Sequence, residues 1–163
     1  MSQRLTIHTI GHSDHTAATF MELLRRRDID LVVDVRSQPY SRWAPQFNRE
    51  TLERELGAAG IRYHFMGDVL GGRPSAPELY VNGDPDYGRM AQTPAYQTGI
   101  ERLLDLAETE RVSIMCSEGD YRNCHRHHLI TQTLLERGAR VIHIEADGQT
   151  VDGECVAKQL SLF

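Results

Sequence analysis

Short apolar runs recur along the chain and alternate with segments in which the apolar residues have helical spacing. Each run is rich in Val and Ile, or is apolar at every second position, which is typical of a β-strand. Five runs have this character, at residues 5–10, 31–35, 63–66, 112–116 and 141–144. We therefore predict five strands.

Between these runs, apolar residues return every three or four positions, as on one face of an α-helix. The sets are Phe20, Leu23 and Leu24; Leu52 and Leu56; Tyr96, Ile100, Leu103 and Ala107; and Ile130 and Leu134. They predict four helices.

Capping residue types mark some of the helix ends. Asn48 and Thr93 are suited to N-caps, and Pro94 suits a first helical position, which needs no N–H donor. Gly60 and Gly138 suit helix ends that close with a left-handed residue.

Alternating strands and helices indicate a mainly parallel sheet with helices on both faces, because parallel strands need crossover connections. We predict an α/β fold of three layers, of the Rossmann or flavodoxin-like kind, in one domain spanning residues 1–163. Ligands bind such sheets outside the carboxyl ends of the strands. Residues that follow the strands are therefore the candidates for function.

The composition is typical of a globular protein and argues against some classes of binding partner. The chain has 163 residues, 40% of them hydrophobic, and a net charge of −5, which argues against a broad nucleic-acid-binding surface. No export signal or membrane span is recognisable, so we expect a cytoplasmic protein without membrane contact. The odd number of cysteines, three, indicates reduced thiols rather than a disulfide framework.

Polar residues and glycines cluster directly after four of the predicted strands. The residues concerned are Gly11, His12 and Ser13; Asp34, Arg36, Ser37, Ser41 and Arg42; Gly71, Gly72 and Arg73; and Ser117, Glu118, Cys124, His125 and Arg126. Residues 67–92 contain Gly, Pro, Asn and Asp without a clear period, and a long loop in a compact domain is usually functional or mobile. We interpret this segment as a cover over the site; a solvated insertion is the alternative.

Several motifs together resemble the domain of unknown function 488 family. They are Ile10-Gly-His-Ser13; Asp34-Val-Arg36 with Pro39 and Ser41-Arg42; Leu70-Gly-Gly72; and Met115-Cys-Ser-Glu118 followed by Cys124-His-Arg126. The resemblance implies an α/β fold with a site in these loops, but no settled reaction. Ser117 is a departure, because related sequences often have Ala there.

Cys116 ends a predicted strand, where backbone donors and a helix dipole can lower a thiol pKa, so it is a candidate nucleophile. Its spacing from Arg122 matches the phosphate loop of phosphatases. Against phosphatase chemistry, Glu118 and Asp120 would bring negative charge into a phosphate cradle. A buried structural thiol is the third reading of Cys116.

Glu118 is the better candidate for acid–base or nucleophilic chemistry, with Asp34 as a second carboxylate on the neighbouring loop. The catalytic candidates are Glu118, Cys116, Asp34 and His12. The two carboxylates have an alternative role, since either could hold a neighbouring arginine as an ion pair.

Four arginines fall at the predicted site of an acidic protein: Arg36, Arg42, Arg73 and Arg126. Their clustering favours an anionic ligand, such as a nucleotide or a phosphorylated sugar. The predicted substrate-binding residues are Ser13, Arg36, Ser37, Arg42, Gly71, Gly72, Cys124, His125 and Arg126.

Cys116, Cys124, His125 and His128 also suggest zinc, with His12 as an outside ligand, but the ligand spacing is incomplete. We therefore assign no metal ligand, and the sequence identifies no cofactor. If the side chains of Cys116 and Cys124 meet, a thiol redox or metal-binding module is an alternative function.

The C-terminal tail, residues 155–163, ends in Gln-Leu-Ser-Leu-Phe, which resembles the peptide by which bacterial DNA polymerases and repair proteins bind the sliding clamp. Gln159 would set the orientation, while Leu162 and Phe163 would fill an apolar pocket. Packing of this tail on the protein's own core is the alternative.

The leading hypothesis from the sequence is a hydrolase or group transferase acting on a nucleotide-like or nucleic-acid-linked substrate. Glu118 and Cys116 would lie nearest the chemistry, and the arginines would bind the anion. A non-catalytic accessory protein of DNA maintenance, tethered to the clamp by its tail, is the second hypothesis.

Overall fold

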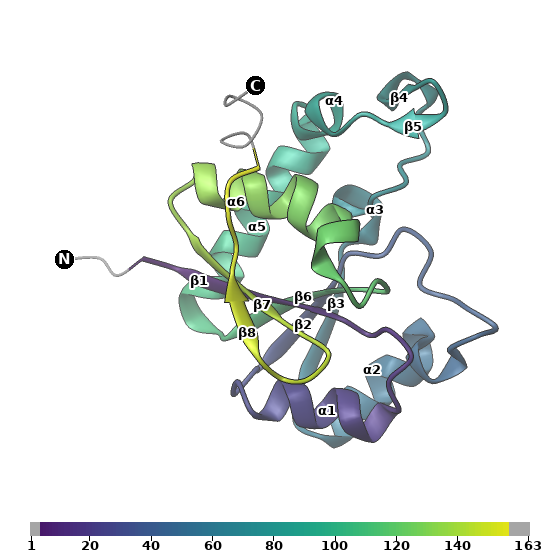
Figure 1. The fold of residues 1–163 in the computed structure, drawn as a ribbon, viewed down its shortest axis with the longest axis vertical. Helices are drawn as coiled ribbons and strands as arrows, with labels where there is room; N and C mark the ends of the chain where they lie inside the picture. The colour runs from purple at the N-terminus through teal and green to yellow at the C-terminus, as the bar shows by residue number, and fades with distance from the viewer. Residues whose placement is uncertain (1–3, 157–163) are drawn as a thin grey trace.

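The computed structural model describes residues 4–156 and has a six-stranded sheet at its centre (Figure 1). The order of the strands across the sheet is β3-β2-β6-β1-β7-β8. Their bounds are β1 Thr6–Gly11, β2 Leu31–Asp34, β3 Arg62–Phe65, β6 Val112–Cys116, β7 Arg140–Ile144 and β8 Thr150–Asp152.

The first five strands of this order are parallel, and β8 pairs antiparallel with β7 at the edge. The prediction of a mainly parallel α/β sheet is therefore confirmed, and its five strands match the five predicted runs. The short edge strand β8 was missed, because Thr150–Asp152 has too few residues to show a period.

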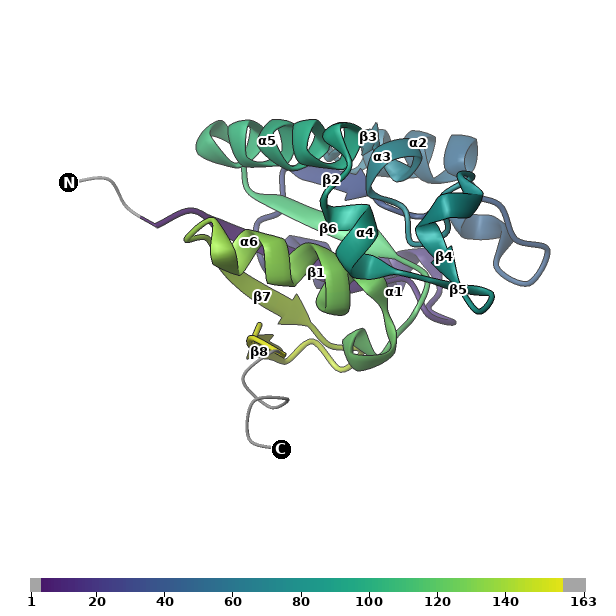
Figure 2. The same ribbon diagram turned by 90° about the horizontal axis from the view of Figure 1, so that it is seen from above.

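Helices cover both faces of the sheet, which makes the three layers visible in Figure 1; Figure 2 looks from above onto α5 and α6. α1 (Ala17–Arg25) and α2 (Arg49–Ala58) pack on one face. α5 (Pro94–Thr109), α6 (Gln132–Glu136) and the π-helical segment η4 (Arg126–Thr131) pack on the other. The fourth predicted helix is thus π-helical in its first half.

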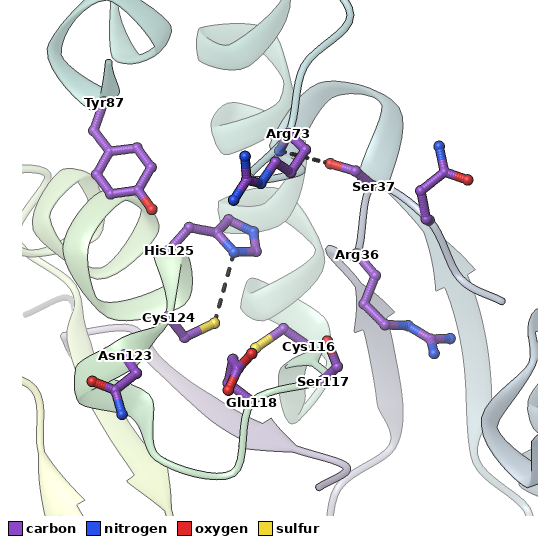
Figure 3. Close-up of a pocket in the computed structure, with 12 residues that line it drawn as sticks. Arg36, Ser37, Arg73, Tyr87, Cys116, Ser117, Glu118, Asn123, Cys124 and His125 are labelled. Atoms are coloured by element: carbon purple, nitrogen blue, oxygen red, sulfur yellow. Dashed lines mark hydrogen bonds between the residues drawn. The ribbon is translucent and has the colours of Figure 1, made fainter. Parts of the chain in front are cut away.

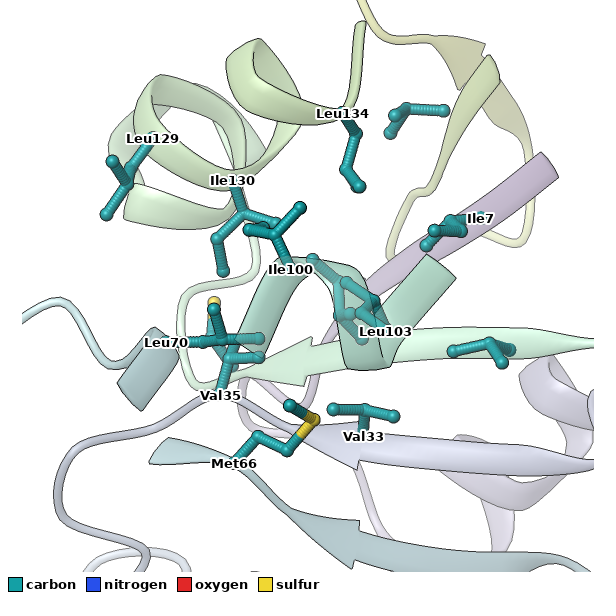
Figure 4. Close-up of a cluster of buried hydrophobic side chains, with 14 of the residues drawn as sticks. Ile7, Val33, Val35, Met66, Leu70, Ile100, Leu103, Leu129, Ile130 and Leu134 are labelled. Atoms are coloured by element: carbon teal, nitrogen blue, oxygen red, sulfur yellow. The ribbon is translucent and has the colours of Figure 1, made fainter. Parts of the chain in front are cut away.

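Alternate residues of each buried strand point to opposite faces, so the sheet separates two hydrophobic cores. Val33 and Ile114 pack with Ile100 and Leu103 of α5 in one core, part of which is drawn in Figure 4. The other core contains the neighbouring strand residues and the apolar faces of α1 and α2: Ile10, Val32, Met115, Phe20, Leu23, Leu24, Leu52 and Leu56.

The structure confirms the positions of Thr93 and Asn48 at helix starts, but only one of the two makes the expected capping hydrogen bond. The Thr93 side chain caps α5 by accepting from the N–H of Tyr96, with Pro94 in the first turn. Asn48 is the N-cap residue of α2, but its Oδ1 accepts from the N–H of Ser41 at 2.7 Å instead. Asn48 therefore fixes the loop that leads into α2 rather than the helix end.

The segment 67–92 is more ordered than its sequence indicates. It contains α3 (Gly67–Leu70), the 3-10 turn η2 (Pro77–Leu79), a hairpin of β4 (Tyr80–Val81) and β5 (Asp84–Pro85), and α4 (Tyr87–Ala91). None of these elements is longer than five residues, so no hydrophobic period could reveal them. Two further 3-10 turns are η1 (Pro45–Phe47) and η3 (Tyr121–Asn123).

Across residues 4–156 we find no helix with the length and apolar character needed to span a bilayer. All three cysteines are free thiols, as the odd count predicted.

Candidate functional site

A pocket of about 330 Å³ opens at the carboxyl ends of β2 and β6 (Figure 3). The topology favours a ligand site at the end of β6, which forms one side of this pocket. β1 connects to β2 through α1 on one face, whereas β6 connects to β7 through η4 and α6 on the other, so the direction of the connections reverses between the adjacent strands β6 and β1. Such a reversal is where α/β sheets bind ligands.

Three regions distant in sequence form the walls of the pocket. They are the loop after β2, the segment 67–92, and the chain from the end of β6 to the start of η4. The lining residues are Arg36, Ser37, Gln38, Gly72, Arg73, Tyr87, Cys116, Ser117, Glu118, Asn123, Cys124 and His125. Figure 3 shows Arg73 and Glu118 on opposite sides of the pocket, with Cys116 beside Glu118.

Two glycines allow the close approaches that shape this site. A Cβ on Gly11 would lie 1.7 Å from the carbonyl oxygen of Glu118, so only glycine lets the end of β1 pass the loop after β6. A Cβ on Gly72 would lie 2.8 Å from the His125 ring, so this glycine lets the 67–92 segment pack on His125. The glycines after the strands are therefore needed for packing.

Asp34 and Arg36 form a buried ion pair below the pocket. Nε of Arg36 donates to Oδ1 of Asp34 at 2.9 Å, and Nη2 donates to Oδ2 at 2.8 Å. The hydroxyl of Tyr63 donates to the same Oδ2 at 2.6 Å. Asp34 is fully buried and does not line the pocket. The ion pair that was the alternative role of this carboxylate is thus present.

Arg126 is fully buried, and no Asp or Glu among residues 4–156 pairs with its guanidinium. Its Nη1 donates to Oγ1 of Thr9 at 2.6 Å, and its Nη2 donates to the carbonyl oxygen of Glu118 at 3.0 Å. These neutral acceptors satisfy donors but supply no negative charge. A buried cation without a counter-anion is costly, so an anion beside Arg126 is stabilised.

Cys116 lies beside this cation. Burial by itself would raise the pKa of its thiol, but a hydrogen bond from Cys124, the charge of Arg126 and the N–H of Glu118 together lower it to about 7. The neighbouring Cys124 has the opposite shift, because its hydrogen bond to Cys116 and its burial both raise its pKa. Of the two thiols, Cys116 therefore ionises more readily, and Cys124 keeps its proton.

His125 is a neutral ring fixed by two backbone carbonyls. Its Nε2 lies 3.0 Å from the carbonyl oxygens of both Val35 and Leu70. Since these oxygens can only accept, Nε2 carries the proton and Nδ1 is free to accept. Burial lowers the pKa of His125 to about 4, so the ring is neutral at pH 7.

The structure gathers seven of the predicted site residues around one pocket: Glu118, Cys116, Arg36, Ser37, Gly72, Cys124 and His125. Six others do not line it. Asp34, Arg126 and Gly71 are buried below or behind its wall, and Ser13 opens onto a separate pocket with Gly119 and Asp120.

Arg42 and His12 are the other two. Arg42 is exposed on the loop after β2. His12 is buried, stacks on Phe47 with ring centroids 4.6 Å apart, and has Nδ1 2.8 Å from the carbonyl oxygen of Ser13. Burial lowers the pKa of His12, so its ring too is neutral at pH 7.

Sequence reasoning missed Gln38, Tyr87 and Asn123 as lining residues. Burial raises the pKa of Tyr87, which lies on α4 within the segment interpreted as a cover. That segment supplies Gly72, Arg73 and Tyr87 to the pocket wall. The irregular composition of residues 67–92 was the only signal for Tyr87, and no pattern pointed to Gln38 or Asn123.

Two motifs with a well-defined spacing do not assemble. Arg122 does not line the pocket; its guanidinium pairs with Asp120 and is 71% exposed, so its spacing from Cys116 forms no phosphate loop. Nε2 of His128, a candidate for zinc, lies 2.6 Å from the carbonyl oxygen of Arg122. A search of residues 4–156 finds no group of three or more His, Cys, Asp or Glu side chains that could hold a metal ion.

Fold and site together define a class: a three-layer α/β protein with a pocket at the carboxyl ends of its strands, in which a central strand ends in a cysteine. A family model described as "Domain of unknown function DUF488" matches residues 16–132, well over half of the chain. The protein belongs to this family, and the resemblance seen in the motifs is confirmed.

A comparison with curated proteins gives no match. The residues predicted to bind the sliding clamp, Gln159, Leu162 and Phe163, lie outside the described part of the chain. Clamp binding therefore stays a prediction.

Proposed function

We propose that this protein is an enzyme that uses the Cys116 thiolate to hydrolyse, or to transfer a group from, a small anionic substrate of nucleotide-like chemistry. Its substrate enters the pocket at the carboxyl ends of β2 and β6. The proposal keeps the leading hypothesis from the sequence but moves the nucleophile from the carboxylates to the thiol.

The observation that supports this most is the pairing of Cys116 with Arg126. A fully buried guanidinium without a carboxylate partner stabilises the thiolate next to it, and the pKa of Cys116 falls to about 7. A thiol with a pKa near the ambient pH combines a large thiolate fraction with high nucleophilicity. Structural cysteines in apolar surroundings have raised pKa values instead.

The basic residues of the pocket support an anionic substrate. Arg73 is exposed, and within residues 4–156 its guanidinium has neither a hydrogen-bond nor an ionic partner. Its backbone N–H donates to Oγ of Ser37 at 2.9 Å, which fixes the start of the side chain at the pocket wall. A guanidinium at the pocket wall suits bidentate binding of a phosphate or carboxylate.

The reaction would proceed in two steps. The Cys116 sulfur forms a bond to the electrophilic atom of the substrate, while the bond to the leaving group breaks and its electrons depart with that group. Water or an acceptor then attacks the covalent intermediate and restores the thiolate. Glu118, exposed on the pocket wall, would take the proton of that second nucleophile.

A test of the nucleophile is the pH dependence of alkylation. We expect Cys116 to react with iodoacetamide with a midpoint near pH 7, whereas an ordinary thiol has its midpoint near pH 8.5. Iodoacetate, which is anionic, should react faster still relative to a free thiol, and Arg73→Ala should remove that preference. A midpoint near the ordinary value would overturn the assignment of Cys116.

Turnover is tested with a panel of nucleotides and sugar phosphates. Compounds that protect Cys116 from alkylation would be selected first, and product formation from them measured next. Cys116→Ser should abolish product formation, while Cys155→Ser, which changes an exposed cysteine away from this pocket, should leave it unchanged. Product formation by the Cys116→Ser variant would contradict the proposal.

A further inference from the structure

Cys116 and Cys124 meet in the pocket although they come from different elements. Cys116 is the last residue of β6, and Cys124 precedes η4. Both residues line the same pocket, and Figure 3 shows the two labelled side chains near each other there. Cys116 is 2% exposed and Cys124 is 5% exposed, so the pair is open only to small molecules that enter this cavity.

The two sulfurs have different hydrogen-bond roles. The N–H of Arg126 donates to Sγ of Cys124 at 3.5 Å, and Nδ1 of His125 lies 3.7 Å from the same sulfur. Since Nε2 of His125 carries the ring proton, Nδ1 is an acceptor that faces a thiol (Figure 3). Cys116 thus ionises more readily, and the thiol of Cys124 has a hydrogen-bond acceptor within reach.

We propose that Cys116 and Cys124 are a peroxide-oxidisable pair that closes to a disulfide and thereby switches off the site. The loss of activity in this inference rests on the proposed function, because the disulfide would remove the proposed nucleophile. The oxidation itself needs only the thiol pair and a hydroperoxide.

The chemistry balances in two steps. The Cys116 thiolate attacks one oxygen of hydrogen peroxide; a sulfur–oxygen bond forms, the oxygen–oxygen bond breaks, and hydroxide leaves. The sulfur of Cys124 then attacks the sulfenic sulfur of Cys116; a sulfur–sulfur bond forms and the sulfur–oxygen bond breaks. The departing hydroxide takes the proton of the Cys124 thiol and leaves as water, while Nδ1 of His125 orients that thiol. In total, the two thiols lose two hydrogen atoms and one peroxide becomes two waters.

The arrangement favours this second step over further oxidation. A sulfenic acid persists until a thiol reaches it or a second peroxide oxidises it. Cys124 and Cys116 line the same small pocket, and their burial limits access by other thiols. Only residues 117–123 separate the two cysteines in sequence, so the disulfide closes a short loop at the pocket wall.

The experiment uses the full chain with Cys155→Ser, which removes the one exposed cysteine. The reduced protein is treated with an equimolar amount of hydrogen peroxide, free thiols are blocked with N-ethylmaleimide, and the peptides are mapped by mass spectrometry. We expect a Cys116–Cys124 disulfide, loss of Cys116 alkylation by iodoacetamide, and recovery of that alkylation after dithiothreitol.

Matched variants assign the two roles. In the Cys155→Ser background, Cys124→Ser should leave Cys116 as sulfenic or sulfinic acid, and Cys116→Ser should leave Cys124 reduced. His125→Gln should slow disulfide formation but not the first oxidation of Cys116, which a dimedone probe detects. Sulfinic acid at Cys116 with Cys124 still free, in protein that has both cysteines, would overturn the inference.

The outcomes of this test and of the turnover test can be separated. A disulfide without any turnover of the substrate panel would keep the redox pair and reject the enzyme. A nucleophilic Cys116 that protects and turns over substrate, but never cross-links to Cys124, would reject the redox pair alone.

Discussion

The chain contains the same ion-paired motif twice, once inside the molecule and once on its surface. In Asp34-Val-Arg36, the backbone N–H and Nε of the arginine donate to Oδ1 of the aspartate, and Nη2 donates to Oδ2. Asp120-Tyr-Arg122 has the same three hydrogen bonds, with lengths of 2.9, 3.0 and 2.9 Å. Local sequence therefore suffices to produce the geometry of the pair.

Burial is what separates the two pairs. The side chains of Asp34 and Arg36 are 0% and 5% exposed, whereas those of Asp120 and Arg122 are 39% and 71% exposed. The inner pair has two additional partners, the hydroxyl of Tyr63 and the carbonyl oxygen of Phe47, while the outer pair faces solvent. Only the inner arginine lines the site, so the motif alone does not mark function.

Arg126 differs from both arginines because it is buried and has no carboxylate partner within residues 4–156. Arg36 is already neutralised by Asp34, and Arg122 by Asp120 and water. The uncompensated charge of Arg126 is therefore the one that lowers the pKa of the Cys116 thiol, and this supports our proposal of Cys116 rather than either aspartate as the nucleophile.

The largest expected effect comes from breaking the inner pair. Asp34→Asn leaves the Arg36 charge buried without its partner, so we expect a loss of about 3–5 kcal/mol in the free energy of unfolding. Asp120→Asn is the matched control in the same motif, and it should cause no measurable loss because exposed pairs contribute little. Urea unfolding measures both. Equal losses would show that burial does not distinguish the two pairs.

Acid should destabilise the protein through its buried histidines. The pKa of His125 is lowered by burial to about 4 in the folded state, against about 6.5 when unfolded, so the unfolded state binds more protons between these values. The stability from neutral His125 is complete above about pH 6.5 and falls as the pH drops towards 4, by about 2 kcal/mol at about pH 5.

His8 and His143 act in the same direction, because burial lowers their pKa values to about 4 and about 3. The measurement is urea unfolding at pH 7 and pH 5, compared with His125→Gln, which keeps an amide donor but does not titrate. The variant should lose less stability on acidification than the wild-type chain. An identical loss of stability in both proteins would show that His125 does not contribute to the acid sensitivity.

The sequence predicts those elements that are long enough to show a hydrophobic period, and it misses the shorter ones. Val33 and Ile114 lie in strands whose apolar runs are evident, and Leu103 lies in a long amphipathic helix, so the layers of the fold could be predicted. β8 and α4 are too short to carry a period. The pairing of strands was implied, but their order was not, because it depends on contacts between distant segments.

The sequence predicts which loops form the site, but not the directions in which their side chains point. The carboxyl ends of parallel strands meet at one edge, which placed Cys116, Glu118 and Arg36 correctly at the same pocket. The direction of each side chain depends on packing that lies outside its own loop. Gly11 admits the Glu118 carbonyl, and Arg126 turns inward to bind it, while Arg122, four residues earlier, turns outward.

Removing the buried charge tests whether Arg126 acts on Cys116. Arg126→Met should raise the pKa of Cys116 by about one unit or more, equivalent to about 1.4 kcal/mol per unit. Arg126→Lys keeps the charge and should retain most of the effect, which separates electrostatics from loss of packing. Circular dichroism verifies that each variant is folded, and alkylation rates against pH give the pKa. An unchanged midpoint in a folded Arg126→Met protein would contradict the pairing.

The smallest expected effect discriminates between two readings of the same cysteine. If Cys116 and Arg122 formed a phosphate loop, Arg122→Ala would weaken anion binding and slow the reaction of Cys116 with iodoacetate. Because Arg122 pairs with Asp120 outside the pocket, we expect no change in that rate. Arg73→Ala is the matched comparison, since it removes a pocket-lining guanidinium instead, and it should slow iodoacetate but not iodoacetamide. A rate reduced by Arg122→Ala and not by Arg73→Ala would exchange the roles of the two arginines and restore the phosphate-loop reading.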